Sequence, residues 1–433
     1  MKPKRLISLL VAVCMMVTML PVSALTAFAV DYPVVNNLKY NFNAAKETAV
    51  VMGIGPDFKN TDDIVIPSTV EYKGTTYKVT EIGLSAFYNH PELTGNLIFA
   101  PNSNVTTIND YAFYGCSGLV GDLTLPESVT VVGNCAFRNC GGLNGTLTLP
   151  CHATALSRMA FDGCKNLKGT LSLPDTLTTL GEYAFHDCSS LQGDVKIPDA
   201  IKTIKEYTFY GCSGLTSVDL NNVTTIGLCS FYKSGLSGRL TVPDTVTTIE
   251  GNAFRDCVNL SGELIIPDSV TSIGGQAFSN CQNLEGEFKI SETLQTLGQR
   301  AFEGAGITKI VLPSDFGSIQ GIDFQNKMLF YDGTRSDVEN ALSNNTRIQN
   351  LDKTDLKIGN NYICYYCDVT FDTDGGTPTS EAQTGILRTN KLDTSKIHTP
   401  SKEGYVFDGW YYEKDGQQLK FDPARSTVLD SMT

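Results

Sequence analysis

The sequence has few of the residues that most often carry out catalysis or bind metals. It contains only four histidines (His90, His152, His186 and His398), and they lie far apart along 433 residues. We find no nucleophile-elbow motif, no paired metal ligands at a recognised spacing, and no glycine-rich phosphate-binding loop. We therefore expect a protein that is not an enzyme, with no catalytic residue, no metal and no cofactor.

Basic residues are also in the minority. Lys and Arg number 33 against 46 Asp and Glu, which gives a formal net charge of −13. Nucleic acids and anionic membrane surfaces attract proteins with clustered Lys and Arg. The composition therefore argues against nucleic acid or an anionic membrane as the main partner.

Only one long apolar run is present, at the N-terminus. Residues Leu6 to Val22 are almost wholly apolar, follow Lys2, Lys4 and Arg5, and precede the small-x-small pattern Ala27-Phe28-Ala29. This order predicts a signal peptide over residues 1–29. Cleavage after Ala24 and an uncleaved anchor remain alternatives. We expect a secreted or cell-surface protein that is not inserted in the membrane once the signal is removed.

The middle of the chain contains ten copies of a short pattern marked by a phenylalanine after a small residue. Successive marker phenylalanines are separated by 26, 24, 24, 24, 24, 22, 23, 24 and 24 residues. A fixed period of this length is typical of a leucine-rich repeat solenoid, in which each unit forms one coil stacked on the last. The marker residues are Phe87, Phe113, Phe137, Phe161, Phe185, Phe209, Phe231, Phe254, Phe278 and Phe302.

One unit, residues 240–264, shows what each coil should contain. Leu240 to Val242 alternates apolar and polar residues, as does Val246 to Ile249, and each segment predicts a short strand with one buried face. The segment Asn252 to Cys257 predicts a tight helical or 3₁₀ turn. The predicted fold is mainly β with short helical turns: a solenoid of about ten coils.

The cysteines follow the same register. Seven of them lie three residues after a marker phenylalanine, where we expect reduced, buried thiols that act as small apolar side chains: Cys116, Cys140, Cys164, Cys188, Cys212, Cys257 and Cys281. Equivalent Cβ atoms in stacked coils should lie slightly too far apart for disulfides. Cys135, Cys151 and Cys229 fall outside this series. Cys364 and Cys367 form a lone C-x-x-C, which we expect to be a local disulfide or free thiols rather than a zinc site.

The repeat resembles the BspA-type leucine-rich repeat family. Residues Ile266 to Cys281 read Ile-Pro-Asp-Ser-Val-Thr-Ser-Ile-Gly-Gly-Gln-Ala-Phe-Ser-Asn-Cys, which is nearly the family consensus, and the resemblance covers Ile82 to Pro313. The unit around Phe231 is short and has Ser234 in place of the usual cysteine, so we expect a kink there. The resemblance implies adhesion to extracellular-matrix proteins such as fibronectin and fibrinogen.

Segments that flank the repeats complete the predicted domain order. Residues 30–80, with a hairpin at Lys73-Gly74, are expected to form an N-terminal cap, because the first coil would otherwise expose its apolar face. The solenoid is predicted over residues 81–313. Residues 314–366 are predicted to be a C-terminal cap and linker, with a short helix from Ser336 to Leu342.

The last segment, residues 367–433, has a different character. Asp368 to Gly376 reads as a strand running into a hairpin, and Lys402 to Tyr411 follows about 30 residues later. Together these segments resemble one Listeria–Bacteroides repeat, a β-grasp-like module. The closing strand of that family is missing, so we expect a small, incomplete module.

A surface for binding is expected on the outward side of the first strand of each coil. These positions alternate with aliphatic residues that we expect to be buried, so their own side chains are not needed for core packing: Asp122, Thr124, Thr146, Thr148, Thr170, Ser172, Asp194, Lys196, Asp219, Arg239, Thr241 and Glu263. We call these twelve residues the first-strand face. We expect it to bind an extracellular macromolecule, with protein favoured, in bacterial adhesion. The alternative is a non-catalytic stalk that presents a C-terminal effector.

Overall fold

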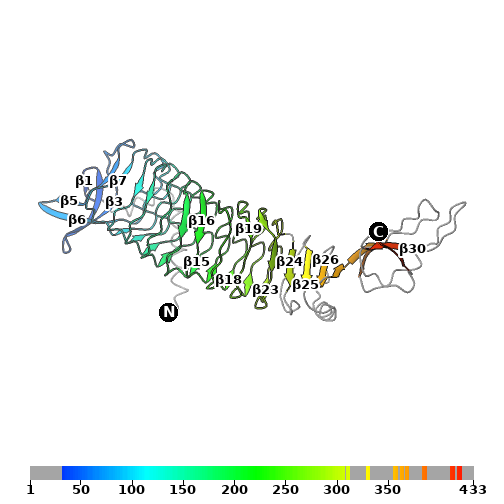
Figure 1. The fold of residues 1–433 in the computed structure, drawn as a ribbon. Coiled ribbons are helices and arrows are strands. Elements are labelled where there is room, and N and C mark those ends of the chain that lie inside the picture. Colours follow the sequence, from blue (N-terminus) through cyan, green and yellow to red (C-terminus); the bar gives the residue numbers. More distant parts are fainter. Residues whose placement is uncertain are drawn as a thin grey trace, which may run out of the picture.

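The computed structural model describes residues 32–307 and, after them, eight further strands. Within the described residues the chain winds into coils that stack along one axis to form a long, curved solenoid (Figure 1). These residues contain strands and turns but no helix, and so no helix that could cross a membrane. The eight later strands are β24 (Lys309–Leu312), β25 (Met328–Tyr331), β26 (Asp355–Ile358), β27 (Asn361–Cys364), β28 (Tyr366–Val369), β29 (Gln383–Leu387), β30 (Trp410–Lys414) and β31 (Gln417–Phe421).

Longer strands lie at the N-terminal end of the stack. Strand β2 (Leu38–Asn43) pairs antiparallel with β1 (Val34–Val35) on one side and with β3 (Thr48–Ile54) on the other. Strand β3 also pairs parallel with β6 (Thr75–Ile82). The predicted hairpin forms between β5 (Thr69–Tyr72) and β6. Its turn residues Lys73 and Gly74 have φ values of 52° and 78°, which is the left-handed backbone of a two-residue hairpin.

Two ladders of short parallel strands run along the solenoid. In the ladder formed by the first strand of each coil, the members are β4 (Ile64–Ile66), β7 (Leu97–Phe99), β9 (Leu123–Thr124), β11 (Leu147–Thr148), β14 (Gly193–Lys196), β16 (Leu215–Asp219), β19 (Gly262–Glu263), β21 (Leu284–Glu285) and β22 (Glu287–Lys289). Between some coils the pairing is reduced to a single parallel β-bridge, as between Thr146 and Lys168 and between Thr170 and Gln192.

The second strand of each coil forms the other ladder. Its members after β6 are β8 (Thr107–Ile108), β10 (Val131–Val132), β12 (Ala155–Leu156), β13 (Thr179–Leu180), β15 (Thr203–Ile204), β17 (Thr225–Ile226), β18 (Thr248–Ile249), β20 (Ser272–Ile273) and β23 (Thr296–Leu297). Threonine hydroxyls join these coils as well: Thr130 Oγ1 donates to the Thr106 carbonyl at 3.2 Å, and Thr154 Oγ1 to that of Thr130 at 3.1 Å.

The turn that carries the marker phenylalanine is not helical, which corrects the predicted helical or 3₁₀ turn. The residues two before and two after each marker have left-handed backbones; around Phe161, Met159 has a φ of 56° and Gly163 of 76°. Alternate amides donate to the next coil instead of along a helix, for example Phe161 N to Ala184 O at 2.9 Å. Left-handed residues and intercoil bonds both prevent the continuous dihedrals that a helix needs.

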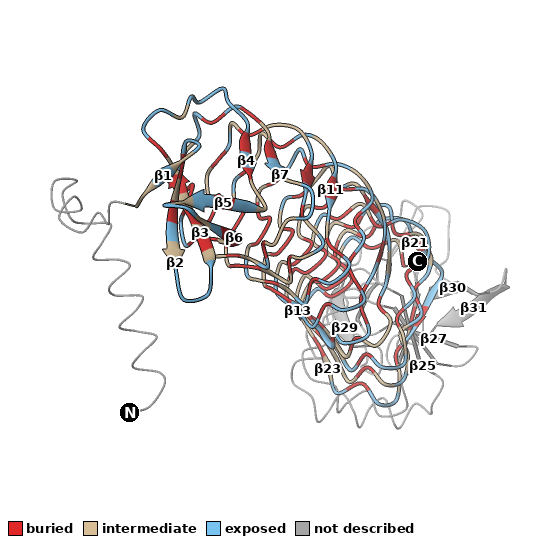
Figure 2. Cartoon of the chain, turned by 90° about the vertical axis from the view of Figure 1, so that its left-hand side faces the viewer, coloured by how far each residue is buried: buried red, intermediate tan, exposed pale blue. Residues whose placement is uncertain are grey.

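The core is a single continuous interior that runs the length of the coils (Figure 2). Neighbouring marker rings stack nearly parallel, with centroids 4.8 Å apart at Phe87–Phe113 and 5.5 Å at Phe137–Phe161. Because no ring can be buried without the coils on either side, the coils depend on one another. Burying each large apolar side chain contributes roughly 1.5–3 kcal/mol before entropy is subtracted.

At Phe231, where a kink is predicted, the stack of marker rings continues. Its ring stacks on Phe209 and on Phe254, at 5.4 Å in both cases, and Ser234 is buried within 3.2 Å of the Cys257 sulfur. A hydroxyl therefore fills the cysteine position without opening the stack. The second-strand ladder is interrupted elsewhere, between β13 and β15.

Parallel pairing continues beyond residue 313, where the sequence pattern fades. Strands β22, β24, β25 and β26 pair in register, and β27 then pairs antiparallel with β26. Apolar strands such as Met328–Tyr331 extend the ladder without the phenylalanine marker. The predicted helix over 336–342 lies outside the described residues. In the last segment β28 pairs with β29 and β30 with β31, both antiparallel.

Candidate functional site

All twelve residues of the first-strand face are exposed. Buried leucines alternate with them, because successive residues of a strand point to opposite sides. The parallel register places Thr124 beside Thr148 and Lys196 beside Asp219. The structure thus brings these residues together as one exposed strip rather than scattering them over the surface.

Hydrogen bonding divides the first-strand face into two kinds of residue. Two acidic members help hold neighbouring coils together: Asp122 accepts the Thr146 amide at 2.7 Å, and Asp194 accepts the Thr216 hydroxyl at 2.8 Å. The hydroxyls of Thr124, Thr148 and Thr170, by contrast, bond to no group in the described part of the protein. The threonine hydroxyls of this strip are therefore available to a ligand, unlike those that join the second strands.

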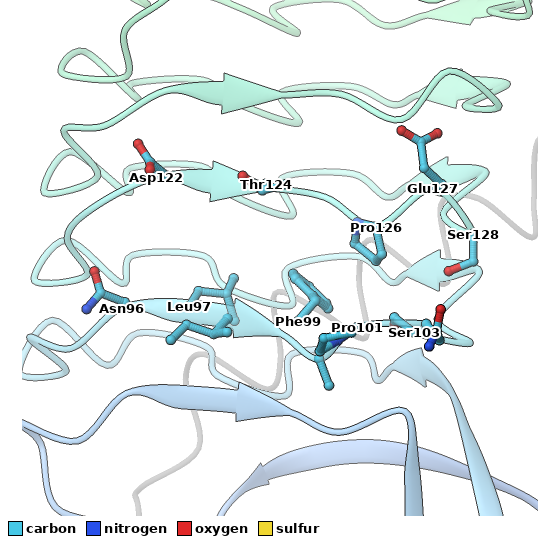
Figure 3. Close-up of a pocket in the computed structure, with 13 residues that line it drawn as sticks. Asn96, Leu97, Phe99, Pro101, Ser103, Asp122, Thr124, Pro126, Glu127 and Ser128 are labelled. Carbon is cyan, nitrogen blue, oxygen red and sulfur yellow. The ribbon is translucent and has the colours of Figure 1, made fainter.

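A hollow lies at the N-terminal end of the first-strand face. It has a volume of about 600 Å³ and is lined by β7, by residues 100–103 and by residues around β9 that include Asp122 and Thr124. Figure 3 shows Asp122 just before β9 and Thr124 on it, with Leu97 and Phe99 on the neighbouring strand β7. Because Asp122 and Thr124 line it, this hollow gives the first-strand face a concave part at its N-terminal end.

The seven cysteines that lie three residues after a marker phenylalanine form a column that we call the cysteine ladder. They are buried inside the coils as free thiols. Each donates its S–H to the carbonyl of the marker phenylalanine one coil earlier, as Cys116 does to Phe87 at 2.9 Å and Cys164 does to Phe137 at 3.0 Å. Burial raises the pKa of both thiols to about 12. They are therefore kept protonated and out of contact with any ligand.

A second candidate surface runs along the turn edge, at the residue after each of the first eight marker phenylalanines. We call it the turn-edge band, and its members are Tyr88, Tyr114, Arg138, Asp162, His186, Tyr210, Tyr232 and Arg255. Each contacts the next. The rings of Tyr88 and Tyr114 stack at 5.0 Å, and those of Tyr210 and Tyr232 at 4.9 Å.

In the centre of the band a carboxylate joins two coils. Asp162 is 6% exposed and lies 2.8 Å from Arg138 Nε and 2.9 Å from His186 Nδ1. His186 then stacks on Tyr210 at 4.6 Å. The repeat pattern alone does not indicate this band, because its members vary from coil to coil. Comparing the position after each marker phenylalanine would have revealed it.

Ring stacking decides what the turn-edge band can bind. Sugar-binding platforms use the open face of an aromatic ring, but here tyrosine faces are covered by the neighbouring coil, with interplanar angles of 13° for Tyr88–Tyr114 and 2° for Tyr210–Tyr232. The edges and hydroxyls remain. Tyrosine and arginine in this setting are typical of protein interfaces.

The cysteines outside the cysteine ladder have different environments. Cys135 and Cys229 are buried below the turn edge, whereas Cys151 is exposed and contacts Glu127 and His152. These three side chains come from neighbouring coils, and spacing along the sequence did not indicate them as a group. The side chains of Cys364 and Cys367, predicted to form a local disulfide or to be free thiols, lie outside the described part of the structure.

Comparison with known families identifies the repeats. The BspA type leucine-rich repeat region matches residues 80–168, 144–261 and 261–369, which together cover most of the chain. The Listeria-Bacteroides repeat domain matches residues 368–433. The chain therefore belongs to the BspA type leucine-rich repeat family and carries a Listeria–Bacteroides repeat at its C-terminal end, as the sequence analysis predicted. Proteins with curated functions give no significant match.

Several solved structures are similar to this chain. A leucine-rich repeat protein from Bacteroides ovatus is 23% identical, with 76% of this chain and 100% of that one covered and a TM-score of 0.41. A leucine-rich cell surface protein from Faecalibacterium prausnitzii is 22% identical, with coverages of 74% and 99% and a TM-score of 0.42. The pneumococcal vaccine antigen PcpA is 19% identical, with coverages of 76% and 98% and a TM-score of 0.44.

Proposed function

We propose that this is a secreted or cell-surface bacterial protein that binds another protein in adhesion, through the first-strand face. The observation that carries the proposal is the row of exposed threonine hydroxyls with no partner among the described residues, over several coils of the solenoid. Export is supported by the predicted signal peptide over residues 1–29. Membership of a repeat family supports a binding role, because solenoids present long surfaces to partners.

A protein partner is favoured over a glycan. The first-strand face has no aromatic side chain among its twelve members, and the stacked tyrosines of the turn-edge band cover one another's faces. Its charges are mixed, with Lys196 and Arg239 beside several carboxylates. Such a surface suits a polar protein partner rather than a strongly charged polymer.

Binding to immobilised extracellular-matrix proteins, measured by biolayer interferometry, tests the proposal. The variant Thr124→Arg with Thr148→Arg places two bulky cations on the first-strand face, and we expect it to weaken binding by about tenfold or more. The same substitutions at Thr179 and Thr203, which are exposed on the second-strand ladder, should leave binding within about twofold.

Two outcomes would count against the proposal. If both variants bind equally well, the first-strand face is not the binding surface. If the unaltered chain shows no saturable binding to matrix proteins or to cells, the alternative of a passive stalk that presents an effector is favoured instead.

A further inference from the structure

One exposed turn between the first and second strands of a coil carries a cysteine and a histidine in succession. In other coils this turn carries small polar or acidic residues after its proline, as in Pro-Asp-Thr or Pro-Asp-Ser at residues 174–176, 243–245 and 267–269, whereas here it reads Pro150-Cys151-His152. Both departures are exposed, so core packing does not explain them. Two adjacent replacements by metal-ligating residue types indicate a local chemical role.

Neighbouring coils bring a third ligand to this turn. Glu127 occupies the equivalent position one coil earlier, and its Oε2 lies 3.1 Å from Cys151 Sγ and 3.8 Å from His152 Nδ1. The Cys151 sulfur lies 3.1 Å from His152 Nδ1. A tetrahedral cation with bonds of 2.0–2.3 Å holds its donor atoms about 3.3–3.7 Å apart. The three donors are therefore already close to coordination geometry.

Backbone contacts hold this arrangement. The Cys151 amide donates to Glu127 Oε2 at 3.0 Å, which fixes the carboxylate against the turn. Thr176, one coil later, donates its hydroxyl to the Cys151 and Ala153 carbonyls at 2.9 and 2.7 Å. Figure 3 shows the Glu127 carboxylate directed toward the next coil rather than into the hollow. The turn is thus braced from the coil on each side.

We propose that Glu127, Cys151 and His152 together bind one divalent cation of the zinc class. Sulfur and imidazole donors select zinc and related metals over calcium and magnesium. On binding, the thiol proton leaves for solvent and the sulfur donates its electron pair to the cation. Three protein ligands leave a fourth position open to solvent, where water or a donor from a bound partner completes the shell.

Titration with Co²⁺ tests the site, because thiolate ligation to cobalt gives a sulfur-to-metal charge-transfer absorption. Every protein used is the full chain with Cys364→Ser and Cys367→Ser, so that the C-x-x-C motif does not contribute. We expect an absorption that saturates at one equivalent and is displaced by Zn²⁺. The variant Cys151→Asp with His152→Thr restores the chain's own repeat turn, so it should fold and lose the absorption.

Single substitutions distinguish the triad from an isolated thiol. Outer-shell groups alone change metal affinity by about 10–100-fold, so Glu127→Gln and His152→Ala should each weaken binding by about tenfold or more. Asp268→Ala, in the same turn of another coil, should leave binding unchanged. The proposal is overturned if no charge-transfer band forms, if the band survives in the repeat-restoring variant, or if Glu127→Gln and His152→Ala both bind as tightly as the parent.

Discussion

Replacing one marker phenylalanine in the middle of the stack should destabilise the protein strongly. Phe161 is fully buried between Phe137 and Phe185, with ring centroids 5.5 and 5.4 Å away. Phe161→Ala removes both ring contacts and leaves a cavity, so we expect the free energy of unfolding to fall by about 4 kcal/mol. Urea unfolding followed by circular dichroism measures the change.

An exposed apolar residue provides the control for this prediction. Leu84 is 63% exposed, so Leu84→Ala should change the free energy of unfolding by less than about 0.5 kcal/mol. The cavity left by Phe161→Ala should also open the coils locally. In the folded Phe161→Ala protein, Cys164 should therefore react with an alkylating reagent faster than Cys281. Equal effects of Phe161→Ala and Leu84→Ala on unfolding would show that the ring stack is not a principal source of stability.

The buried cysteine ladder should make the protein unusually sensitive to alkaline pH. The pKa values of the Cys116, Cys164 and Cys257 thiols rise from an ordinary 9.0 to about 12, because burial disfavours the thiolate. Above pH 9 the unfolded chain therefore loses thiol protons that the native chain retains. Stability is fully present below this pH and falls until about pH 12, by about 1.4 kcal/mol per pH unit for each thiol.

A triple variant isolates the thiol contribution. Cys116→Ala with Cys164→Ala and Cys257→Ala removes three of these groups, so the loss of stability per pH unit should be smaller by about 4 kcal/mol than in the parent. Tyrosine and lysine ionisation affects both proteins alike, so the slopes are compared and not the absolute stabilities. Urea midpoints between about pH 9 and pH 11 give both slopes, and equal slopes would contradict the assignment of protonated native thiols.

Residues that repeat could be predicted from the sequence, because each position is sampled ten times. The marker phenylalanine, the strand leucines and the cysteine three residues after the marker all define one buried interior, and the structure places them there. Exposure of the first-strand face follows from the same alternation. The register of one coil thus determined the register of its neighbours.

Backbone conformation in the turns could not be predicted from residue types. Glycine favours a left-handed backbone, but the position two residues before each marker holds Ser85, Tyr111, Met159 or Arg300 among others, all with positive φ. Intercoil hydrogen bonds impose this conformation on ordinary side chains. The helical turn was therefore the wrong expectation for a segment whose amides bond between coils.

Contacts between different residue types in successive coils were the other omission. The turn-edge band mixes tyrosine, arginine, aspartate and histidine, and the group of Glu127, Cys151 and His152 has three different residues, so a search for one conserved residue type per coil does not find them. Both become visible once coils are aligned, since Glu127 and Cys151 each follow a strand-ending proline. In a solenoid, departures from the repeat are where a specific site is to be sought.

A double-mutant cycle on the phenylalanine stack tests most directly whether the coils stabilise one another. Phe137→Ala and Phe161→Ala remove adjacent rings, whereas Phe113→Ala and Phe278→Ala remove rings near opposite ends of the array. We expect the adjacent pair to show a coupling energy of about 1 kcal/mol or more, and the distant pair to be additive within about 0.5 kcal/mol. Equal coupling energies for the two pairs would contradict a core built from contacts between neighbouring coils.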